Sequence, residues 1–472
     1  MASSVTSALQ AAVQSLANGT LDILSIRRFH LLPSPERFKN IILLGLPIMG
    51  GMLSQSLLNL IDAAMVGSLG TAALAGVGLG GYANFMAIAL VMGLGVGVQA
   101  TVARRRGEGL IEQSAQPLNN GLLIASLIAL PLSLFCWVNA ERIISLLSND
   151  PEVTSIGTDY FRWRALAIIA VGCNFAFRGY WNGIRRTGMY LQILVVMHIF
   201  NVFISYGLIF GHFGLPEMGA EGSGLGTTLA MFLGTALYFL LSWRQGREQG
   251  FLRSLPRMAD IRVMLRLSIP NSLQQLFFAA GFTVLMWIIG QIGTSELAVA
   301  HILINLALLL ILPGVGLGMA ATTLVSHSLG EQQPHEAYRW GWDVVKVAAL
   351  MLFVLGMPFW LAPQLVLQIF TQEPELLALG EWPLRITGLG MTLDATALVL
   401  TQALLGAGAS RTVMGVNLGS QWLLFLPCAY LLGPVLGGGL LAVWLLQSLY
   451  RVIASVIFAI LWRRKHWTEI RF

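Results

Sequence analysis

Charged residues are scarce in this chain of 472 residues, of which they make up only 11%, against about 25% in ordinary soluble domains. Hydrophobic residues make up 56%. This composition excludes an ordinary soluble globular protein and is typical of a chain that crosses a membrane many times. The basic residues are scattered along the chain rather than gathered into one patch, so we expect no nucleic-acid partner.

Cysteine and closely spaced histidine are also lacking. The three cysteines, Cys136, Cys173 and Cys428, are odd in number and show no CxxC spacing, which argues against a disulfide framework or a zinc site. None of the seven histidines has a second histidine three or four residues further on, as a metal-binding helix would need. We therefore expect no metal, no cofactor and, without a nucleophile–base pair, no enzyme.

What the chain does contain is long apolar runs. Spanning a bilayer takes about 20 apolar residues per helix, and twelve stretches qualify. They lie near 39–66, 73–103, 119–140, 157–183, 189–211, 220–243, 262–289, 296–326, 342–362, 379–406, 412–432 and 437–462. The sequence thus predicts an all-α polytopic membrane protein with twelve transmembrane helices.

Most Lys and Arg residues fall at the two ends of the chain or in the even-numbered loops, whereas the odd-numbered loops carry mainly acids. The positive-inside rule then places both termini in the cytoplasm, in an inner or plasma membrane. The predicted division is a cytoplasmic tail (1–38), an N-lobe (39–243), a cytoplasmic linker (244–261), a C-lobe (262–462) and a second cytoplasmic tail (463–472).

The two halves of the chain resemble each other at an offset of 223 residues. This register pairs Pro47 with Pro270, Glu108 with Glu331, and Pro151 with Pro374, among other matches. Each half holds six predicted spans, an even number, so both halves enter the membrane with the same topology. Two pseudo-symmetric six-helix lobes related by an axis along the membrane normal are expected, as in transporters that keep their substrate site between two lobes.

Asp62 is the only charged residue between Ile41 and Val66. A charge inside a membrane helix costs at least about 2.5 kcal/mol and usually marks an ion pathway or a ligand site. Gln55 and Asn59 precede Asp62 at helical spacing, so all three share one face of the helix, which we expect to line a cavity. The plainer alternative is a buried acid whose hydrogen bonds only hold its helix in place.

Two more polar residues of the first half, Asn201 and Thr227, are predicted at the membrane depth of Asp62, which makes a site for a proton or a small cation possible. Burial favours the neutral form of a carboxyl group, so Asp62 could take up and release a proton. Pro47 lies in the same helix and removes one backbone hydrogen bond. It is a candidate hinge, and a static kink is the alternative.

Other polar residues are weaker candidates. Asp394 is the only acid in the interior of the tenth span and could form a second site. Tyr82 lies among methionines of the first two spans, where adaptable side chains suit a cavity for varied apolar ligands. Asp159 and Arg162, three residues apart, are expected to form a surface ion pair.

These motifs together resemble those of the multidrug and toxic compound extrusion (MATE) family, in the superfamily of multidrug, oligosaccharidyl-lipid and polysaccharide flippases. The residues that carry the resemblance are Leu46-Pro47-Ile48, Asn59-Leu-Ile-Asp62, Val66-Gly-Ser-Leu-Gly70 and the segment Gly219 to Thr227. The resemblance implies twelve helices in two lobes and export of organic cations and other amphipathic compounds in exchange for H⁺ or Na⁺. It also implies an ion-coupling site at Asp62, Asn201 and Thr227.

Two departures from the family pattern bear on the coupling ion. Ser205 stands where some members carry an Asp, and Phe278 stands where the Na⁺-coupled branch carries a Glu, while Asp394 matches that branch. Losing two carboxylates weakens an oxygen-rich Na⁺ site more than a single-acid proton site. The prediction is therefore a cation-coupled antiporter, driven by H⁺ with Na⁺ as the alternative, which exports amphipathic or cationic compounds by alternating access as a monomer.

Two other functions remain open at this point. A flippase for a lipid-linked oligosaccharide has a related two-lobe architecture, but it would need a cationic cavity, and Arg178 and Arg451 are the few deep cations that the sequence offers. An ion channel is also possible, although a channel needs no cavity of drug size.

Overall fold

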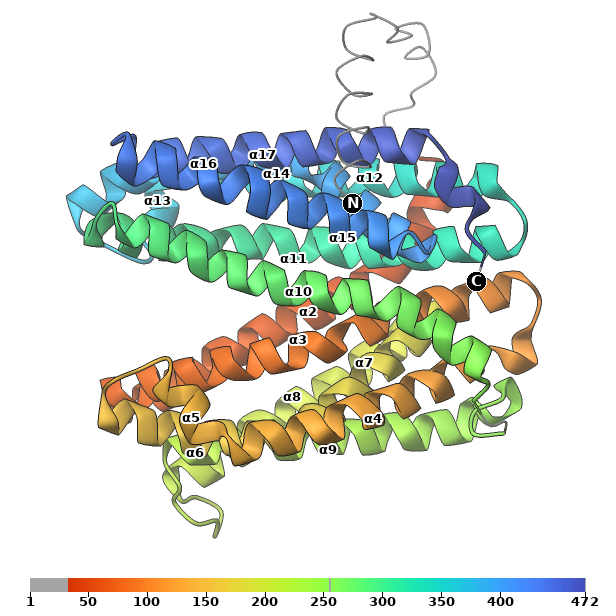
Figure 1. The fold of residues 1–472 in the computed structure, drawn as a ribbon, viewed down its shortest axis with the longest axis horizontal. Coiled ribbons are helices and arrows are strands. Elements are labelled where there is room, and N and C mark those ends of the chain that lie inside the picture. Colours follow the sequence, from red (N-terminus) through yellow and green to blue (C-terminus); the bar gives the residue numbers. More distant parts are fainter. Residues whose placement is uncertain (1–32, 254–255, 472) are drawn as a thin grey trace, which may run out of the picture. The chain divides into compact units, whose positions relative to one another are not determined.

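The computed structural model describes residues 33–253 and 256–471. The predicted N-terminal tail (1–38) lies mostly outside these residues, and the first helix already begins at Pro35. In the part of the chain that is described, the regular structure is helical and contains no strand (Figure 1), which confirms the all-α prediction. The first half contains α2 (Pro35–Gly67), α3 (Thr71–Gly107), α4 (Gln116–Val138), α5 (Ala140–Ser145), α6 (Pro151–Leu166), α7 (Ile168–Gly183), α8 (Thr187–Phe210) and α9 (Ala220–Gln245).

The second half follows with α10 (Met258–Gly290), α11 (Thr294–Gly330), α12 (Pro334–Leu361), α13 (Pro363–Leu367), α14 (Pro374–Gly406), α15 (Ser410–Leu418), α16 (Leu426–Tyr430) and α17 (Gly439–Arg463). Two π-helical stretches, η4 (Gly419–Phe425) and η5 (Leu431–Val435), flank α16. They make 410–435 a single helical rod of irregular winding. Short 3₁₀ turns, η2 (Ile111–Gln113), η3 (Arg247–Gln249) and η6 (His466–Glu469), complete the described elements.

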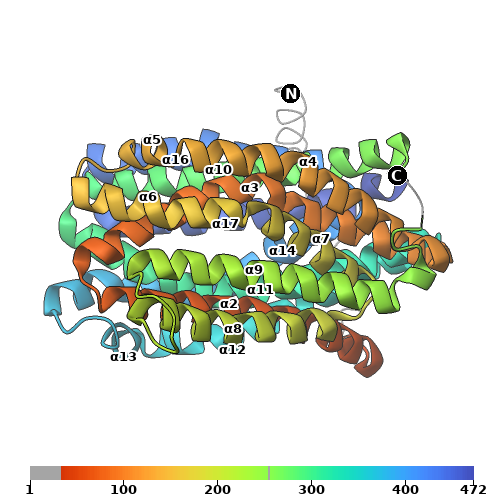
Figure 2. The ribbon, with the colours of Figure 1, turned by 90° about the horizontal axis from the view of Figure 1, so that it is seen from below.

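Eleven helical segments of the described chain are long and apolar enough to cross a membrane. The remaining predicted span, 157–183, is divided between α6 and α7, which follow one another in Figure 2 and hold 16 residues each. The division lies at Ala167, whose N–H donates to the carbonyl oxygen of Arg164 at 3.1 Å, three residues back instead of four. Neither helix alone has the roughly 20 residues that a span needs.

The helix boundaries repeat between the two halves as the sequence register predicts. Both α2 and α3 begin and end 223 residues before α10 and α11. Likewise α6 begins at Pro151 and α14 at Pro374. The repeat is imperfect at Ala167, because α14 continues without interruption through the equivalent position, Gly390.

The chain forms two compact units. Among the described residues, the N unit contains Pro47–Leu276 and residues 330–332, and the C unit contains residues 33–46, Phe277–Leu329 and Gln333–Arg471. Both main boundaries fall inside long helices, α2 and α10. The units differ from the predicted lobes at both boundaries. The first turns of α2 belong to the C unit, and the first half of α10 belongs to the N unit.

Inside the N unit, α3 packs against α4, α6 and α7. Glycines allow the closest approaches: a Cβ added at Gly80 of α3 would lie 2.7 Å from the ring of Tyr160 on α6. Small residues at helix contacts are how membrane helices pack closely without a hydrophobic driving force between them. Large buried side chains fill the rest, among them Phe161, Phe177 and Trp181.

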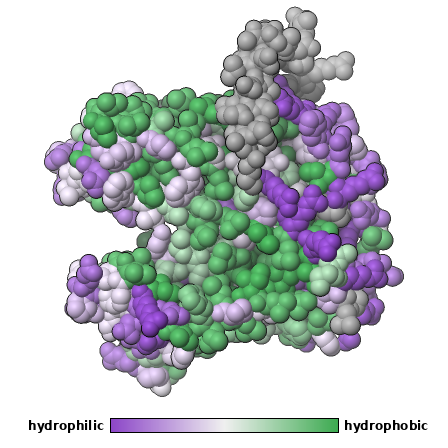
Figure 3. Space-filling view, in the orientation of Figure 1, coloured by the Kyte–Doolittle hydropathy of each residue, from purple (hydrophilic) through white to green (hydrophobic). Residues whose placement is uncertain are grey.

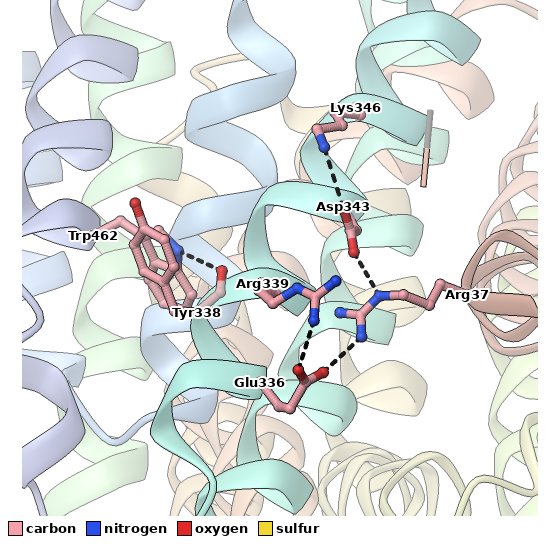
Figure 4. Close-up of polar contacts among 7 residues, drawn as sticks. All are labelled: Arg37, Glu336, Tyr338, Arg339, Asp343, Lys346 and Trp462. Carbon is pink, nitrogen blue, oxygen red and sulfur yellow. Dashed lines mark hydrogen bonds and ion pairs between the residues drawn. The ribbon is translucent and has the colours of Figure 1, made fainter. Parts of the chain in front are cut away.

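Inside the C unit, α14 packs against α12 and α17, and Trp444 of α17 donates its indole N–H to the Thr387 hydroxyl at 3.0 Å. The first turn of α2 is bound to α12 through Arg37. Its guanidinium donates to Asp343 at 2.6 Å and to Glu336 at 2.7 Å (Figure 4). The ring of Trp340 lies 3.7 Å from the same guanidinium carbon.

The exposed side chains suit a lipid environment. Leucines such as Leu127, Leu134 and Leu423 are more than 60% exposed. In each unit the visible face is apolar along the middle of the helices, and hydrophilic residues gather at helix ends (Figure 3). Helices of this length with apolar outer surfaces are what a bilayer requires.

Candidate functional site

The polar face of α2 lies against α8 in the N unit. Ser54 Oγ is 2.9 Å from His198 Nδ1, and Gln55 Oε1 is 3.2 Å from His198 Nε2. Gln55 also donates its side-chain N–H to Asn59 Oδ1 at 3.1 Å. The i, i+4 pair predicted from spacing therefore shares one face and forms a chain of hydrogen bonds with a buried histidine. His198 was not among the predicted site residues.

The register between α2 and α8 fixes the level of Asp62. Near one end of the contact, a Cβ added at Gly51 would lie 2.7 Å from the ring of Tyr190. Near the other end, Val66 packs in one buried cluster with Ile209. Asp62 therefore lies at about the level of residues 201–205 of α8.

A second contact joins α8 to α9 at this level. Ser205 donates its hydroxyl to Asn201 Oδ1 at 3.2 Å, and Gly226 of α9 lies so close that an added Cβ would be 2.9 Å from the Ser205 Cα. Thr227 follows directly and donates to the carbonyl oxygen of Ser223 at 3.0 Å. The structure thus brings Asn201 and Thr227 to neighbouring positions of two packed helices, at the level of Asp62.

Asp62 has a cationic neighbour that the sequence analysis missed. The guanidinium of Arg164, near the end of α6, acts electrostatically on the Asp62 carboxylate, and both charges act on the buried Tyr160 hydroxyl. Asp62 Oδ1 is buried without a hydrogen-bond partner among the described residues, and so are Nε and Nη1 of Arg164. The available signal was a cation inside a predicted span, the same signal that identified Asp62.

The position of Arg164 is fixed by the residue before it. The Thr228 hydroxyl of α9 donates to the carbonyl oxygen of Trp163 at 2.8 Å, and the Trp163 indole donates to Glu221 at 2.6 Å. This places Arg164 of α6 beside the Thr227 region of α9. The N unit therefore gathers an acid, a base, an amide and hydroxyl groups from α2, α6, α8 and α9.

Asp394 lies in the C unit in a different setting. The residue is 5% exposed, and its carboxylate accepts a hydrogen bond from Arg451 Nη1 of α17 at 2.6 Å. The sequence analysis named Arg451 as a deep cation but did not pair it with Asp394. Within the described residues, no cluster of three or more His, Cys, Asp or Glu side chains is arranged to hold a metal ion.

A family model for MatE matches residues 47–207 and 270–431, more than half of the chain. The chain belongs to the MatE family. The predicted family is thereby confirmed, and with it the prediction of a transporter rather than an enzyme. The two matched segments of this MatE protein begin at Pro47 and Pro270, the prolines that the internal register pairs.

Relatives of this MatE protein are similar over most of their length. A probable multidrug resistance protein NorM of Agrobacterium fabrum is 28% identical over 448 residues, which cover 91% of this chain and 95% of the relative. A Thermotoga maritima protein of the same name is 26% identical, covering 90% of each chain. A solved structure of an outward-facing multidrug resistance MATE family transporter superposes with a TM-score of 0.84 at 21% identity, covering 92% and 97% of the two chains. That likeness shows the shared fold.

The remaining predicted residues are placed as follows. Pro47 lies inside the continuous helix α2 and begins the N unit, and its role as a hinge stays a prediction. Tyr82 is half-buried on α3, and its role in a cavity likewise stays a prediction. The expected surface pair is confirmed: Arg162 Nη1 lies 3.6 Å from Asp159 Oδ1, and both side chains are more than 40% exposed.

Proposed function

We propose that this MatE protein is a proton-coupled antiporter that exports amphipathic or cationic organic compounds by alternating access, with Asp62 as the coupling site. The relatives named multidrug resistance proteins, similar over about nine-tenths of their length, support export of such compounds. The observation that carries the coupling role is the Asp62 carboxylate, a membrane acid with an oxygen that lacks a hydrogen-bond partner in the described chain. An acid left incompletely paired inside a membrane helix points to function.

The surroundings of Asp62 favour H⁺ over Na⁺. A hard cation prefers several oxygen ligands, and the charged group that acts on this carboxylate is the guanidinium of Arg164, which would repel one. Ser205, which stands where some family members carry an acid, donates its hydroxyl to Asn201. A single carboxyl group, in contrast, is sufficient to bind one proton.

The C unit offers no better Na⁺ ligand at its own predicted site. Asp394 accepts a short hydrogen bond from Arg451, and a carboxylate already paired with an arginine is a poor cation ligand because the guanidinium neutralises it. The same contact argues against a lipid-linked oligosaccharide flippase, because Arg451 is hydrogen-bonded to Asp394 and is not available to bind a pyrophosphate. Proton-driven export remains the leading proposal.

Orientation and assembly complete the proposal. Both termini lie in the cytoplasm of an inner or plasma membrane, because the basic loops and tails then lie on the inner side. The transporter works as a monomer. Single cysteines introduced at Lys39 and Arg464, in a variant whose three native cysteines are replaced by serine, test this orientation. Both should react with a membrane-impermeant thiol reagent only after the cells are opened.

Efflux of ethidium from proteoliposomes under an imposed ΔpH or ΔNa⁺ tests the coupling. Wild-type protein should export under ΔpH and not under ΔNa⁺ alone. Asp62→Asn should abolish ΔpH-driven efflux, whereas Asp394→Asn should retain it. Asp159→Asn is the matched control, because it removes an acid from an exposed pair.

Each alternative gives its own pattern. Efflux under ΔNa⁺ alone would identify Na⁺ as the coupling ion. Normal ΔpH-driven efflux by Asp62→Asn would remove Asp62 from the mechanism. Scrambling of labelled lipid without ethidium efflux would favour the flippase.

A further inference from the structure

We propose that Arg164 is the resident counter-ion of Asp62, so that pairing with Arg164 and protonation of Asp62 exclude one another. The inference deepens the proposed function and rests on it, because it assumes that Asp62 carries the transported proton. It assigns to Arg164 a role in ion selectivity: when the two side chains pair, the guanidinium takes the place at the carboxylate that a Na⁺ ion would otherwise take. Binding of a proton frees the arginine, and loss of the proton restores the pairing.

Unused hydrogen-bonding atoms on the two side chains support the pairing. Asp62 Oδ1 is a buried acceptor without a donor, and Arg164 Nε and Nη1 are buried donors without an acceptor. The two charges act on one another electrostatically, yet no hydrogen bond joins them in this structure. A buried charge without a partner is costly. Each group supplies what the other lacks.

The backbone around Arg164 is held on one side and interrupted on the other. Trp163 is bound to α9 through Thr228 and Glu221, so the backbone just before Arg164 is attached to α9. Directly after the last turn of α6, the Ala167 N–H returns to the carbonyl oxygen of Arg164 and the helix ends. Broken membrane helices occur where their ends line a site or a cavity. A small rearrangement at the break could bring the guanidinium onto the carboxylate.

Only one of the two side chains changes its charge during the proposed cycle, and that side chain is Asp62. Arginine stays protonated under all physiological conditions and has only donors, so its attraction to Asp62 depends on the charge of Asp62 alone. A neutral carboxyl group loses most of this attraction. A cationic substrate that reaches Asp62 would displace Arg164 in the same manner as a proton does.

The other titratable groups around the pair belong to three elements. These are Tyr160 of α6, His198 of α8 at Ser54 and Gln55, and a separate group formed by Asp159 and Arg162 within α6 and Glu221 in the first turn of α9. On α2 no charged residue other than Asp62 lies between Ile41 and Val66, and on α9 none lies between Glu221 and Arg244. Arg164 is therefore the charge whose removal should change the proton affinity of Asp62 most.

The pH profile of ethidium efflux tests the role directly. With Arg164→Gln, Asp62 loses the charge that favours its ionised form, so the midpoint of the profile should move to higher pH by about one unit, a tenfold change in proton concentration. Arg164→Lys keeps a charge and should restore most of the wild-type midpoint. Arg164→Gln should also gain Na⁺-dependent thermal stabilisation that the wild type lacks. The control Arg162→Gln, in the exposed pair, should shift neither quantity.

Thermal stability in detergent gives a readout that does not need transport. Asp62→Asn should lower the Tm, because it leaves the Arg164 charge uncompensated, and Asp62→Asn combined with Arg164→Gln should recover much of the loss. If Arg164→Gln does not fold, the double variant decides: recovery of folding supports the pairing, and failure of both shows that Arg164 serves packing alone.

The two proposals fail in different ways. Asp62→Asn without ΔpH-driven efflux, together with an unchanged midpoint in Arg164→Gln, would overturn the counter-ion role and leave the proposed function standing. Normal ΔpH-driven efflux by Asp62→Asn would overturn the proposed function itself. An equal shift of the pH midpoint of efflux in Arg164→Gln and Arg164→Lys would overturn the counter-ion role, because it would show that the shape of the arginine matters and not its charge.

Discussion

Asp62 in the N unit and Asp394 in the C unit are both acids in the interior of a long apolar helix, and each has an arginine near it in its own unit. Arg451 donates to Asp394 at 2.6 Å. Arg164 acts on Asp62 only through its field, and donors and acceptors on both side chains stay unused. The same two residue types thus form a closed pair in one unit and an open pair in the other.

The difference fits the proposed coupling role of Asp62 and a structural role of Asp394. In a closed pair, each partner stabilises the charged form of the other, so the acid has little tendency to exchange its ion. In the open pair, no hydrogen bond from Arg164 holds Asp62 in its charged form, which suits the proposed coupling site. The internal repeat does not explain the contrast, because the registers of the two halves place neither acid opposite the other.

The largest expected effect comes from breaking the closed pair. Arg451→Met should lower the free energy of unfolding by about 3–5 kcal/mol, because it leaves a buried carboxylate without its partner. Replacing both residues, as Asp394→Leu with Arg451→Met, should restore most of the stability, since an apolar pair of similar volume is often neutral. Thermal unfolding in detergent measures both variants.

Transport by the same double variant sharpens the comparison. Because the closed pair is assigned a structural role, ΔpH-driven efflux should persist in the double variant at wild-type pH dependence. Loss of efflux in a folded double variant would contradict that assignment and place Asp394 in the coupling mechanism.

The sequence predicted the fold better than the site. Apolar length predicted the helices and the paired prolines predicted the repeat, because each depends on local sequence or on regular spacing. The orientation derived from the basic residues stays a prediction. The interruption at Ala167 was not predicted from these signals, since Ala167 lies within the uninterrupted apolar run 165–171.

Within the site, Asp62 could be predicted because a lone acid in an apolar run is conspicuous. Arg164 and His198 could not be linked to Asp62 or Gln55, because those contacts join helices far apart in the sequence. Asp394 was likewise predicted as a polar position, but its partner Arg451 lies on another helix. Spacing along one helix identifies a face, whereas pairing across helices requires the fold.

The next effect concerns α2, which begins in the C unit and carries Asp62 in the N unit. Arg37→Ala should lower the free energy of unfolding by about 2 kcal/mol, because it removes hydrogen bonds between charged groups. The loss is limited because Glu336 keeps Arg339 and Asp343 keeps Lys346. Lys39→Ala, at an exposed position of the same turn, is the matched control and should change the Tm little. An equal change in both variants would show that Arg37 does not anchor the helix.

A smaller effect is expected where α8 and α9 meet beside the open pair. Gly226→Ala places a Cβ 2.9 Å from the Ser205 Cα, and overpacking of this kind costs about 1–3 kcal/mol. The displaced α8 carries Asn201, so the pH midpoint of efflux should move as well. Gly78→Ala on α3 is the control, because a Cβ there meets nothing within 4 Å. A stable Gly226→Ala with an unchanged midpoint would show that the helix spacing has no influence on Asp62.

The smallest effect is expected for the third acid–arginine pair, Asp159 with Arg162. This pair is exposed, so comparing it with the buried pair of Asp394 and Arg451 tests the influence of burial. The charged atoms of the exposed pair are 3.6 Å apart and both side chains are more than 40% exposed, so solvent screens the attraction and Asp159→Asn should change the free energy of unfolding by less than about 0.5 kcal/mol. The same substitution type at Asp62 removes the proposed coupling site, and at Asp394 it breaks a buried pair. Unfolding of Asp159→Asn at high and low ionic strength measures this effect. A loss of unfolding free energy as large as that of Asp394→Asn would show that burial does not decide the strength of these pairs.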